Sequence, residues 1–129
     1  MEEYYRHELK MMIYWAETNL MRQCNRWLEA RYHPLKVYMR VRDRLDHDGT
    51  RIPVLDLASL SVKKEHQRKG HFTAFLELME TIAKENKRAV FVESILEPWL
   101  FQWLQEKRGY EVAPHDDRSL IKPFTEEPT

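Results

Sequence analysis

The residues best suited to chemistry lie at positions 57–76, where an apolar strand leads through a short basic loop into an amphipathic helix. The first turn of a helix has backbone N–H groups without intrahelical acceptors, and the helix dipole favours an anion beside them. Arg68 and Lys69 add positive charge, and Gly70 lets the backbone approach a ligand closely. We therefore expect the N–H groups of residues 68–73 to bind a phosphate or pyrophosphate. On composition alone, a polar loop with solvated basic residues is the alternative.

The elements that must position this loop follow from hydrophobic periodicity and turn residues. Residues 36–45 alternate apolar and polar side chains, and a turn cluster at 46–50 joins them to the apolar run 52–62, so the two strands form a hairpin. Apolar residues recur at helical spacing over 72–86, and 89–92 is a short buried strand. We expect the two apolar strands and the helix to form a right-handed parallel βαβ unit.

The rest of the C-terminal half continues the alternation of helices and strands. Glu97 and Pro98 start a helix that ends at Gly109. Two short strands, 110–113 and 119–124, follow around a turn at Asp116 and Asp117, and we expect residues 124–129 to form a frayed tail. The chain shows no repeat or linker, so residues 1–129 are expected to form one domain.

Two segments resemble signatures of the GNAT superfamily of N-acetyltransferases. Gln67 and Gly70 match the acyl-CoA-binding pattern Gln/Arg-x-x-Gly-x-Gly/Ala, with Phe72 in place of the small residue. Leu104-Gln105-Glu106-Lys107-Arg108-Gly109-Tyr110 is similar to the family's Leu-Tyr-Glu-Lys-x-Gly-Phe. The resemblance covers residues 52–113. It implies an α/β (α+β) fold, with a mixed central sheet flanked by helices and a reduced N-terminal half.

The resemblance implies acetyl-CoA as the acyl donor, without a metal. In such proteins the backbone of the strand end pairs with the pantetheine arm and donates to the oxyanion, and Val62 lies at the expected five residues before Gln67. The implied cofactor-binding residues are Leu60, Ser61, Val62, Gln67, Arg68, Lys69, Gly70, His71, Phe72 and Thr73. The implied activity is acetyl transfer from the thioester to a primary amine of an unidentified small molecule or protein, by direct attack in a ternary complex.

Such a transfer requires a neutral amine, and the first candidate for a general base is Asp56. It lies six residues before Val62, and burial in the apolar run would raise the pKa of its carboxyl. Alternatively, Asp56 faces solvent or pairs with an arginine of the neighbouring strand. Glu93 and Ser94 end the next strand near the expected acetyl group, where the alternative to catalysis is hydrogen bonding at the strand end. These three residues are the catalytic candidates.

Two departures from the family pattern favour a second function. Gln105 stands where many members have a tyrosine that protonates the leaving thiolate, and glutamine has no titratable proton. The part before the central strand is also shorter than usual. The alternative is therefore a catalytically weak or inactive GNAT-like protein that binds acyl-CoA and acts through a protein or nucleic-acid partner.

The N-terminal third allows two interpretations. Residues 9–15 are apolar and could form a strand, followed by a helix capped by Thr18 or Asn19 that buries Trp27 and Leu28. The competing interpretation is one long helix, because apolar residues recur at helical spacing at Tyr5, Leu9, Met12 and Ala16. We prefer the strand followed by a helix because the resemblance favours it.

Composition limits the partners. The 21 basic and 21 acidic residues cancel, so no net field attracts nucleic acid, and little repulsion opposes a homodimer. The single cysteine excludes an intramolecular disulfide and a multi-cysteine zinc site. No long uncharged apolar run is present, so we expect a cytoplasmic protein without a membrane span. The basic strand with Lys36, Arg40, Arg42 and Arg44 is expected to be a solvated face, with an acidic substrate or a nucleic acid as the alternative ligand.

Overall fold

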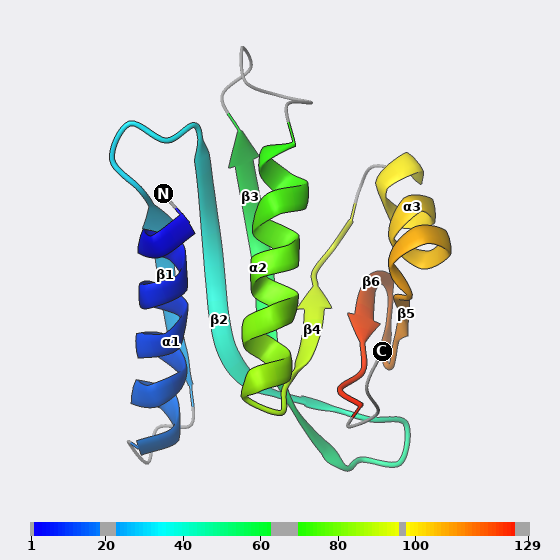
Figure 1. The fold of residues 1–129 in the computed structure, drawn as a ribbon. Coiled ribbons are helices and arrows are strands. Elements are labelled where there is room, and N and C mark those ends of the chain that lie inside the picture. Colours follow the sequence, from blue (N-terminus) through cyan, green and yellow to red (C-terminus); the bar gives the residue numbers. More distant parts are fainter. Residues whose placement is uncertain (1, 19–22, 63–69, 96–97, 126–129) are drawn as a thin grey trace.

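The computed structural model describes residues 2–18, 23–62, 70–95 and 98–125 of the 129-residue chain. It contains one six-stranded sheet in the order β1-β2-β3-β4-β6-β5 (Figure 1). The strands are β1 (Cys24–Glu29), β2 (Leu35–Leu45), β3 (Arg51–Val62), β4 (Ala89–Val92), β5 (Glu111–Ala113) and β6 (Asp116–Lys122). The helices are α1 (Glu2–Thr18), α2 (His71–Glu85) and α3 (Pro98–Arg108).

The predicted mixed sheet with flanking helices is confirmed. Strands β2 and β3 form the expected antiparallel hairpin, and Gly49 in its turn has a φ of 84°. Strands β3 and β4 are parallel and are joined through α2, as expected for a βαβ unit. The remaining strand pairs are antiparallel.

The preferred interpretation of the N-terminal third is wrong. Residues 2–18 form one helix, and β1 occupies the place of the expected second helix. The side chains that α1 buries recur at helical spacing and are Tyr5, Leu9, Met12, Ile13 and Ala16. A short apolar run fits a strand as well as one face of a helix, and here tertiary packing along the whole helix decides. The structure also places Trp27 on a strand with half of its surface exposed, rather than inside a helix.

A smaller correction concerns the last hairpin. Asp116 and Asp117 belong to β6, and the turn lies one step earlier, where His115 has a φ of 66°. The polar character of the two aspartates is compatible with a strand here because β6 begins partly exposed. In the described part of the chain, none of the helices is long and apolar enough to span a membrane.

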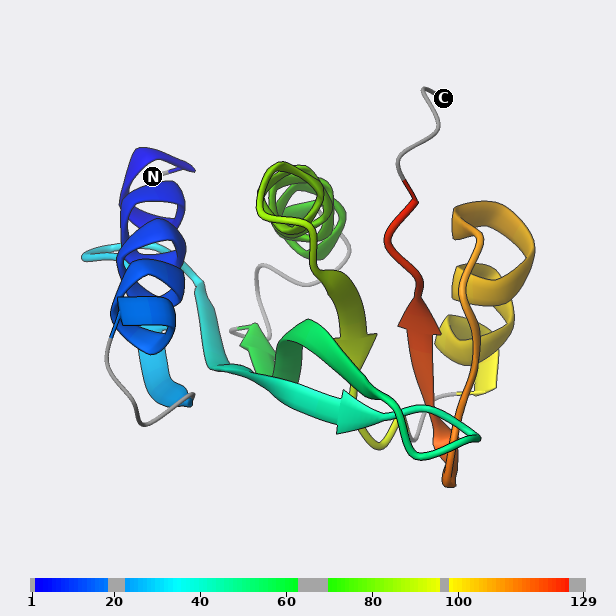
Figure 2. The ribbon, with the colours of Figure 1, turned by 90° about the horizontal axis from the view of Figure 1, so that it is seen from below.

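Alternation along the strands gives the sheet two unlike faces. Helices α1 and α2 lie side by side on one face (Figure 2), where they enclose the main core. On β2 the residues Val37, Met39 and Val41 are buried there, while the side chains between them lie on the other face. We call this second face the open face. Its apolar cluster is formed only by strand residues, namely Val54, Ala89, Phe91, Ala113 and Ile121, with Ile52 packed against them.

Candidate functional site

Strands β3 and β4 part at the middle of the sheet. Their parallel pairing ends with Leu57 and Val92, and the N–H of Glu93 donates to the Leu57 carbonyl at 3.0 Å. The chain then turns toward β6, where the N–H of Ile95 donates to the carbonyl of Arg118 at 2.8 Å. Figure 1 shows this segment leaving β4 toward α3. The second half of β3 therefore lacks β4 as its neighbour.

At the same level, β3 carries one extra residue relative to β2. Met39 pairs with Leu57, but the next residue of β2, Tyr38, pairs with Ser59. Ala58 is therefore a β-bulge, which shifts the alternation of β3 by one position.

The bulge turns the backbone of Leu60 toward the side that β4 has left. Leu57 and Leu60 pair with Met39 and Val37, which lie two residues apart on β2 and so occupy equivalent positions in the ladder. Because the backbone of Leu57 bonds to β4, the backbone groups of Leu60 point the same way. Residues 60–62, predicted to pair with pantetheine, thus contain a backbone edge suited to a ligand.

The N-terminus of α2 follows the predicted loop. Gly70 has a φ of 82°, and its carbonyl accepts the N–H of Ala74 at 3.0 Å. Within the described residues no side chain caps this helix, so the N–H groups of its first turn remain suited to an anion. Phe72 packs against the main core, and the His71 ring lies 5.2 Å from that of His33.

Gly70 is required for its conformation rather than for space. A Cβ atom built there meets nothing within 4 Å, but the positive φ is one that side chains rarely adopt. The expected ligands Gln67, Arg68 and Lys69 lie outside the described residues, as does the side chain of Val62.

The catalytic candidate Asp56 is buried on the open face and pairs with an arginine. Its side chain is 0% exposed, and the Arg44 guanidinium donates to Oδ2 at 3.0 Å. Arg44 also donates to Glu93, so it bridges the two carboxylates. The guanidinium lies 4.0 Å from the ring centre of Phe91, and Arg40 approaches Glu93 at 3.6 Å. We call Asp56, Glu93, Arg44 and Arg40 the carboxylate cluster.

The pKa of Asp56 is raised to about 7, chiefly by burial. The negative charge of Glu93 contributes to this rise, whereas Arg44 and Arg40 oppose it. Within the described residues, Oδ1 of Asp56 is buried without a hydrogen-bond partner. Asp56 therefore pairs with a neighbouring-strand arginine, one of the two predicted alternatives, and also has the raised pKa that a general base needs. The cluster lies beside the point where β3 and β4 stop pairing, since Asp56 precedes Leu57 and Glu93 follows Val92.

Among the described residues, no hydrogen bond or ion pair joins Ser94 or Gln105 to the carboxylate cluster. The Ser94 side chain is exposed, and its residue has a φ of 47°. Its N–H donates to the Ser119 hydroxyl at 2.9 Å, which holds the chain as it turns away from β3. Gln105 is exposed on α3.

The comparisons with known proteins identify the fold. No protein-family model and no curated protein matches the sequence. A solved structure of AtaT complexed with acetyl-methionyl-tRNAfMet matches with a TM-score of 0.51, over 70% of this chain and 71% of that chain, at 12% identity. AtaT belongs to the GNAT-fold acetyltransferase toxins. The chain has a GNAT-like fold.

Two further solved structures give lower scores. An AtaT mutant toxin bound to the C-terminus of the antitoxin AtaR and acetyl-CoA has a TM-score of 0.48 and 14% identity, with coverage of 67% of this chain and 59% of that chain. The KacTA–DNA complex has a TM-score of 0.49 and 16% identity, with coverage of 67% and 57%. The chain thus spans less than two thirds of the length of these two proteins.

The second GNAT-like segment has a packing role. Burial raises the pKa of Tyr110 well above its usual range, and its hydroxyl donates to Glu80 of α2 at 2.8 Å. Arg108 donates to the same carboxylate at 2.6 Å. These bonds fix the end of α3 against α2.

Sequence reasoning allowed for an arginine partner of Asp56, but it did not identify Arg44 and it missed the contacts of both arginines with Glu93. Arg40 and Arg44 were expected on a solvated strand face, but both contact buried or half-buried carboxylates. The sequence did contain a signal for arginines near Asp56. A hairpin that turns at residues 46–50 places Arg40 opposite Asp56, and the register confirms this pairing.

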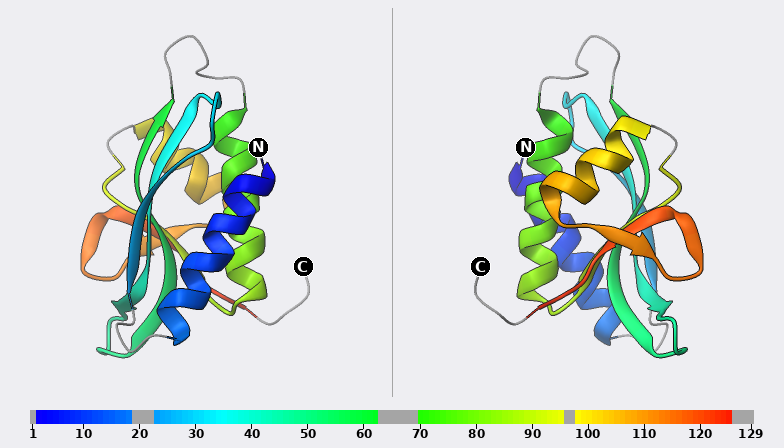
Figure 3. Two further views of the ribbon diagram at one scale, coloured as in Figure 1. Left: turned by 90° about the vertical axis from the view of Figure 1, so that its left-hand side faces the viewer. Right: turned by 90° about the vertical axis from the view of Figure 1, so that its right-hand side faces the viewer.

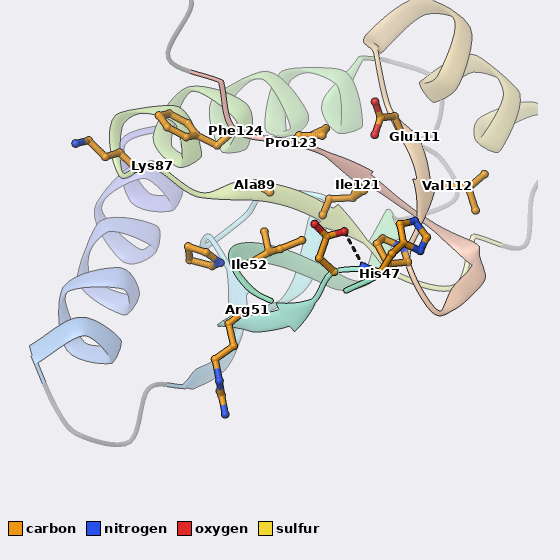
Figure 4. A pocket seen from close by; sticks show the side chains of 13 residues that line it. His47, Arg51, Ile52, Lys87, Ala89, Glu111, Val112, Ile121, Pro123 and Phe124 are labelled. Atoms are coloured by element: carbon orange, nitrogen blue, oxygen red, sulfur yellow. Dashed lines mark hydrogen bonds between the residues drawn. The ribbon is translucent and has the colours of Figure 1, made fainter. Parts of the chain in front are cut away.

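A separate pocket of about 410 Å³ lies at the other end of β3 (Figure 4). The β2–β3 turn and the C-terminal strands line it, with His47, Arg51, Ile52, Glu111 and Ile121 among its residues. It contains none of the predicted site residues. Within the described residues, no group of three or more His, Cys, Asp or Glu side chains could hold a metal ion.

Proposed function

We propose that this protein is an acetyl-CoA-dependent N-acetyltransferase that transfers the acetyl group to a primary amine by direct attack in a ternary complex. The observation that carries the proposal is the end of β3–β4 pairing at Leu57 and Val92. The part of β3 beyond this point leads toward the uncapped N-terminus of α2, and a buried carboxylate with a pKa of about 7 lies one residue before it. The GNAT-like fold supports the same function.

In this proposal the pyrophosphate binds at the start of α2. The N–H groups of Gly70, His71, Phe72 and Thr73 face it, and Gln67, Arg68 and Lys69 complete the loop around it. The pantetheine arm follows the edge of β3 at Leu60, Ser61 and Val62. The acetyl group then lies next to Glu93, where the two strands part.

The chemistry requires one proton to leave the amine and one thiolate to leave the acetyl carbon. Ionised Asp56 accepts the amine proton, directly or through a water molecule, and the amine nitrogen attacks the carbonyl carbon. The N–H of Leu60 stabilises the oxyanion. Collapse of the tetrahedral intermediate breaks the C–S bond. A thiol has a pKa of about 8.5, so the thiolate can leave without a general acid, consistent with the absence of a titratable proton on Gln105.

In this proposal Glu93 and Ser94 support Asp56 and the course of the chain but do not react with the substrate. Glu93 raises the proton affinity of Asp56 and shares Arg44 with it. Ser94 provides the turn that separates the chain from β3, through its backbone bond to Ser119. Only Asp56 is proposed to exchange a proton with the substrate.

The test of cofactor binding is calorimetric titration of the full chain with acetyl-CoA. We expect Gly70→Asp to weaken binding by about tenfold or more, because the new carboxylate repels the pyrophosphate and caps the N–H groups itself. Gly49→Asp is the matched control, since Gly49 has a similar φ of 84° and equally open surroundings. Equal affinity of the two variants, or a folded native chain that binds no acetyl-CoA, would reject the proposal.

Catalysis is tested separately by thioester cleavage with a simple primary amine such as ethanolamine. We expect Asp56→Asn to lower the rate by about 10²-fold or more while acetyl-CoA still binds, because loss of a general base typically has an effect of this size. Binding without any turnover by the native protein would instead favour the acyl-CoA-binding, catalytically inactive alternative that exposed Gln105 suggests.

A further inference from the structure

Because residues 24–29 form a strand that pairs with β2, two aromatic side chains meet on the open face. Trp27 is the cross-strand partner of Tyr38, and their ring centres are 5.0 Å apart. Trp27 is 50% exposed. A helix at this position would have buried Trp27 and kept it away from β2, so the pair is a feature that only the structure reveals.

Cations flank this aromatic pair. The Lys36 ammonium lies 4.8 Å from the Trp27 ring centre, and the Arg40 guanidinium lies 5.4 Å from that of Tyr38. Arg42 continues the same alternating column on β2. We call Trp27, Lys36, Tyr38, Arg40 and Arg42 the β1–β2 platform.

The platform is accessible and bordered by small polar groups. Helices α1 and α2 both lie on the opposite face of β1 and β2 (Figure 3). Ser59 and Ser61, the cross-strand partners of Tyr38 and Lys36, have exposed side chains. The result is a strand surface with hydroxyl groups beside it that neither α1 nor α2 covers.

The charges of the platform complement an anion. The Arg40 guanidinium already forms an ion pair with the Glu93 carboxylate, at 3.6 Å. For Lys36 and Arg42, the described residues provide no ion pair with a carboxylate. Glu29 is the cross-strand partner of Lys36, and it is the one acidic residue that the register of β1 places directly beside the platform. The chain is neutral overall, but this patch is locally basic.

We propose that the β1–β2 platform binds single-stranded nucleic acid. Every base has a π face that can stack on an aromatic ring, and the phosphates between stacked bases need nearby cations. Trp27 and Tyr38 supply the stacking surfaces, and Lys36 and Arg42 supply the phosphate contacts. The proposal concerns binding alone and holds whether or not the protein transfers acetyl groups. It replaces the expectation from net charge, which averages over the whole surface and misses a local patch.

The experiment measures fluorescence anisotropy of a labelled, short oligouridylate RNA with the full chain. We expect binding that weakens with salt, with a slope of log K against log[salt] of about −1.4 for two phosphate contacts. Trp27→Ala and Tyr38→Ala should each lower the affinity by about tenfold, since stacking is worth about 1–3 kcal/mol per base. Glu29→Gln should raise it, because a repelling carboxylate is removed.

Two controls make the result specific. Trp99→Ala removes a tryptophan that is 61% exposed on α3, away from the platform, and should leave RNA affinity unchanged. Trp27→Ala should keep native circular dichroism and native acetyl-CoA affinity. The proposal is overturned if the folded native chain binds no RNA, if Trp27→Ala binds as tightly as the native chain, or if duplex RNA binds as tightly as the single strand.

Discussion

The two faces of the sheet use the same strands for different purposes. On the helix-covered face, β2 and β3 contribute fully buried apolar side chains such as Val37 and Leu55. On the open face, the alternating positions of these strands contribute arginines, Tyr38 and the buried Asp56. The difference shows that stability and chemistry are separated by the two-residue period of a strand. Substitutions in the main core should lower the free energy of unfolding at any pH, whereas those around Asp56 should change binding, rate and the pH dependence of stability.

The largest effect on stability is expected on the covered face. Leu76 of α2 is 0% exposed in the main core, so Leu76→Ala should lower the free energy of unfolding by about 3–5 kcal/mol through lost burial and a cavity. Leu45→Ala is the control, because Leu45 is 52% exposed and should change stability by less than about 1 kcal/mol. Urea denaturation measures both. Similar losses for the two variants would show that burial in the main core does not set the size of the effect.

On the open face, Asp56 should make stability depend on pH. The unfolded chain releases this proton near the ordinary pKa of 3.8, whereas the folded protein retains it up to about 7. Between these values the unfolded state binds fewer protons, so stability falls as pH rises. Relative to Asp56→Asn, the native protein should lose about 2–4 kcal/mol of unfolding free energy between pH 4 and 7. A constant difference over this range would show that Asp56 is not protonated in the folded state.

The neighbours of Asp56 should shift the pH dependence of acetyl transfer in opposite directions. Glu93→Gln removes a charge that raises the pKa of Asp56, so the rate should begin to rise at lower pH. Arg40→Gln removes a charge that lowers this pKa, so the rise should move to higher pH. The pH profile of kcat/KM with ethanolamine measures both variants. Shifts in the same direction would exclude Asp56 as the group that titrates.

The smallest effect on stability is expected for an exposed ion pair that joins helix α1 to the sheet. Arg26 of β1 contacts Glu8 of α1 at 3.0 Å, with the arginine side chain 49% exposed. Arg26→Gln should lower the unfolding free energy by less than about 1 kcal/mol, because solvent screens such pairs. The loss should shrink further in high salt. A larger loss in urea denaturation would mean that this pair holds α1 against the sheet.

Sequence reasoning was most successful where periodicity and turn residues agree. The alternation of 36–45, the turn around Gly49 and the apolar run 52–62 allow one arrangement, a hairpin, and the structure contains it. The strong helical stripe after residue 71 likewise predicted α2. The N-terminal third failed because apolar residues 9–15 fit either period. There, contacts of α1 with α2 and the sheet decide the outcome, and a single sequence does not display them.

The candidate site was predictable in part. The position of Asp56 within an apolar strand left burial with a raised pKa and pairing with an arginine as alternatives, and the structure combines the two. The bridge from Arg44 to Glu93 depends on side chains that reach across three strands, from β2 to β4, which no local pattern specifies. The bulge was also hidden, because Ala58 is an ordinary strand residue and only the pairing with β2 identifies it as extra.

The bulge at Ala58 keeps the two faces of β3 in place although the strand carries one extra residue. If Ala58 itself paired with Tyr38, strict alternation would turn Ser59 into the main core and Leu60 onto the open face. Deleting Ala58 would instead leave Ser59 opposite Tyr38 and Leu60 opposite Val37. The face of each residue beyond position 58 is therefore set by its partner on β2 rather than by its distance along the chain.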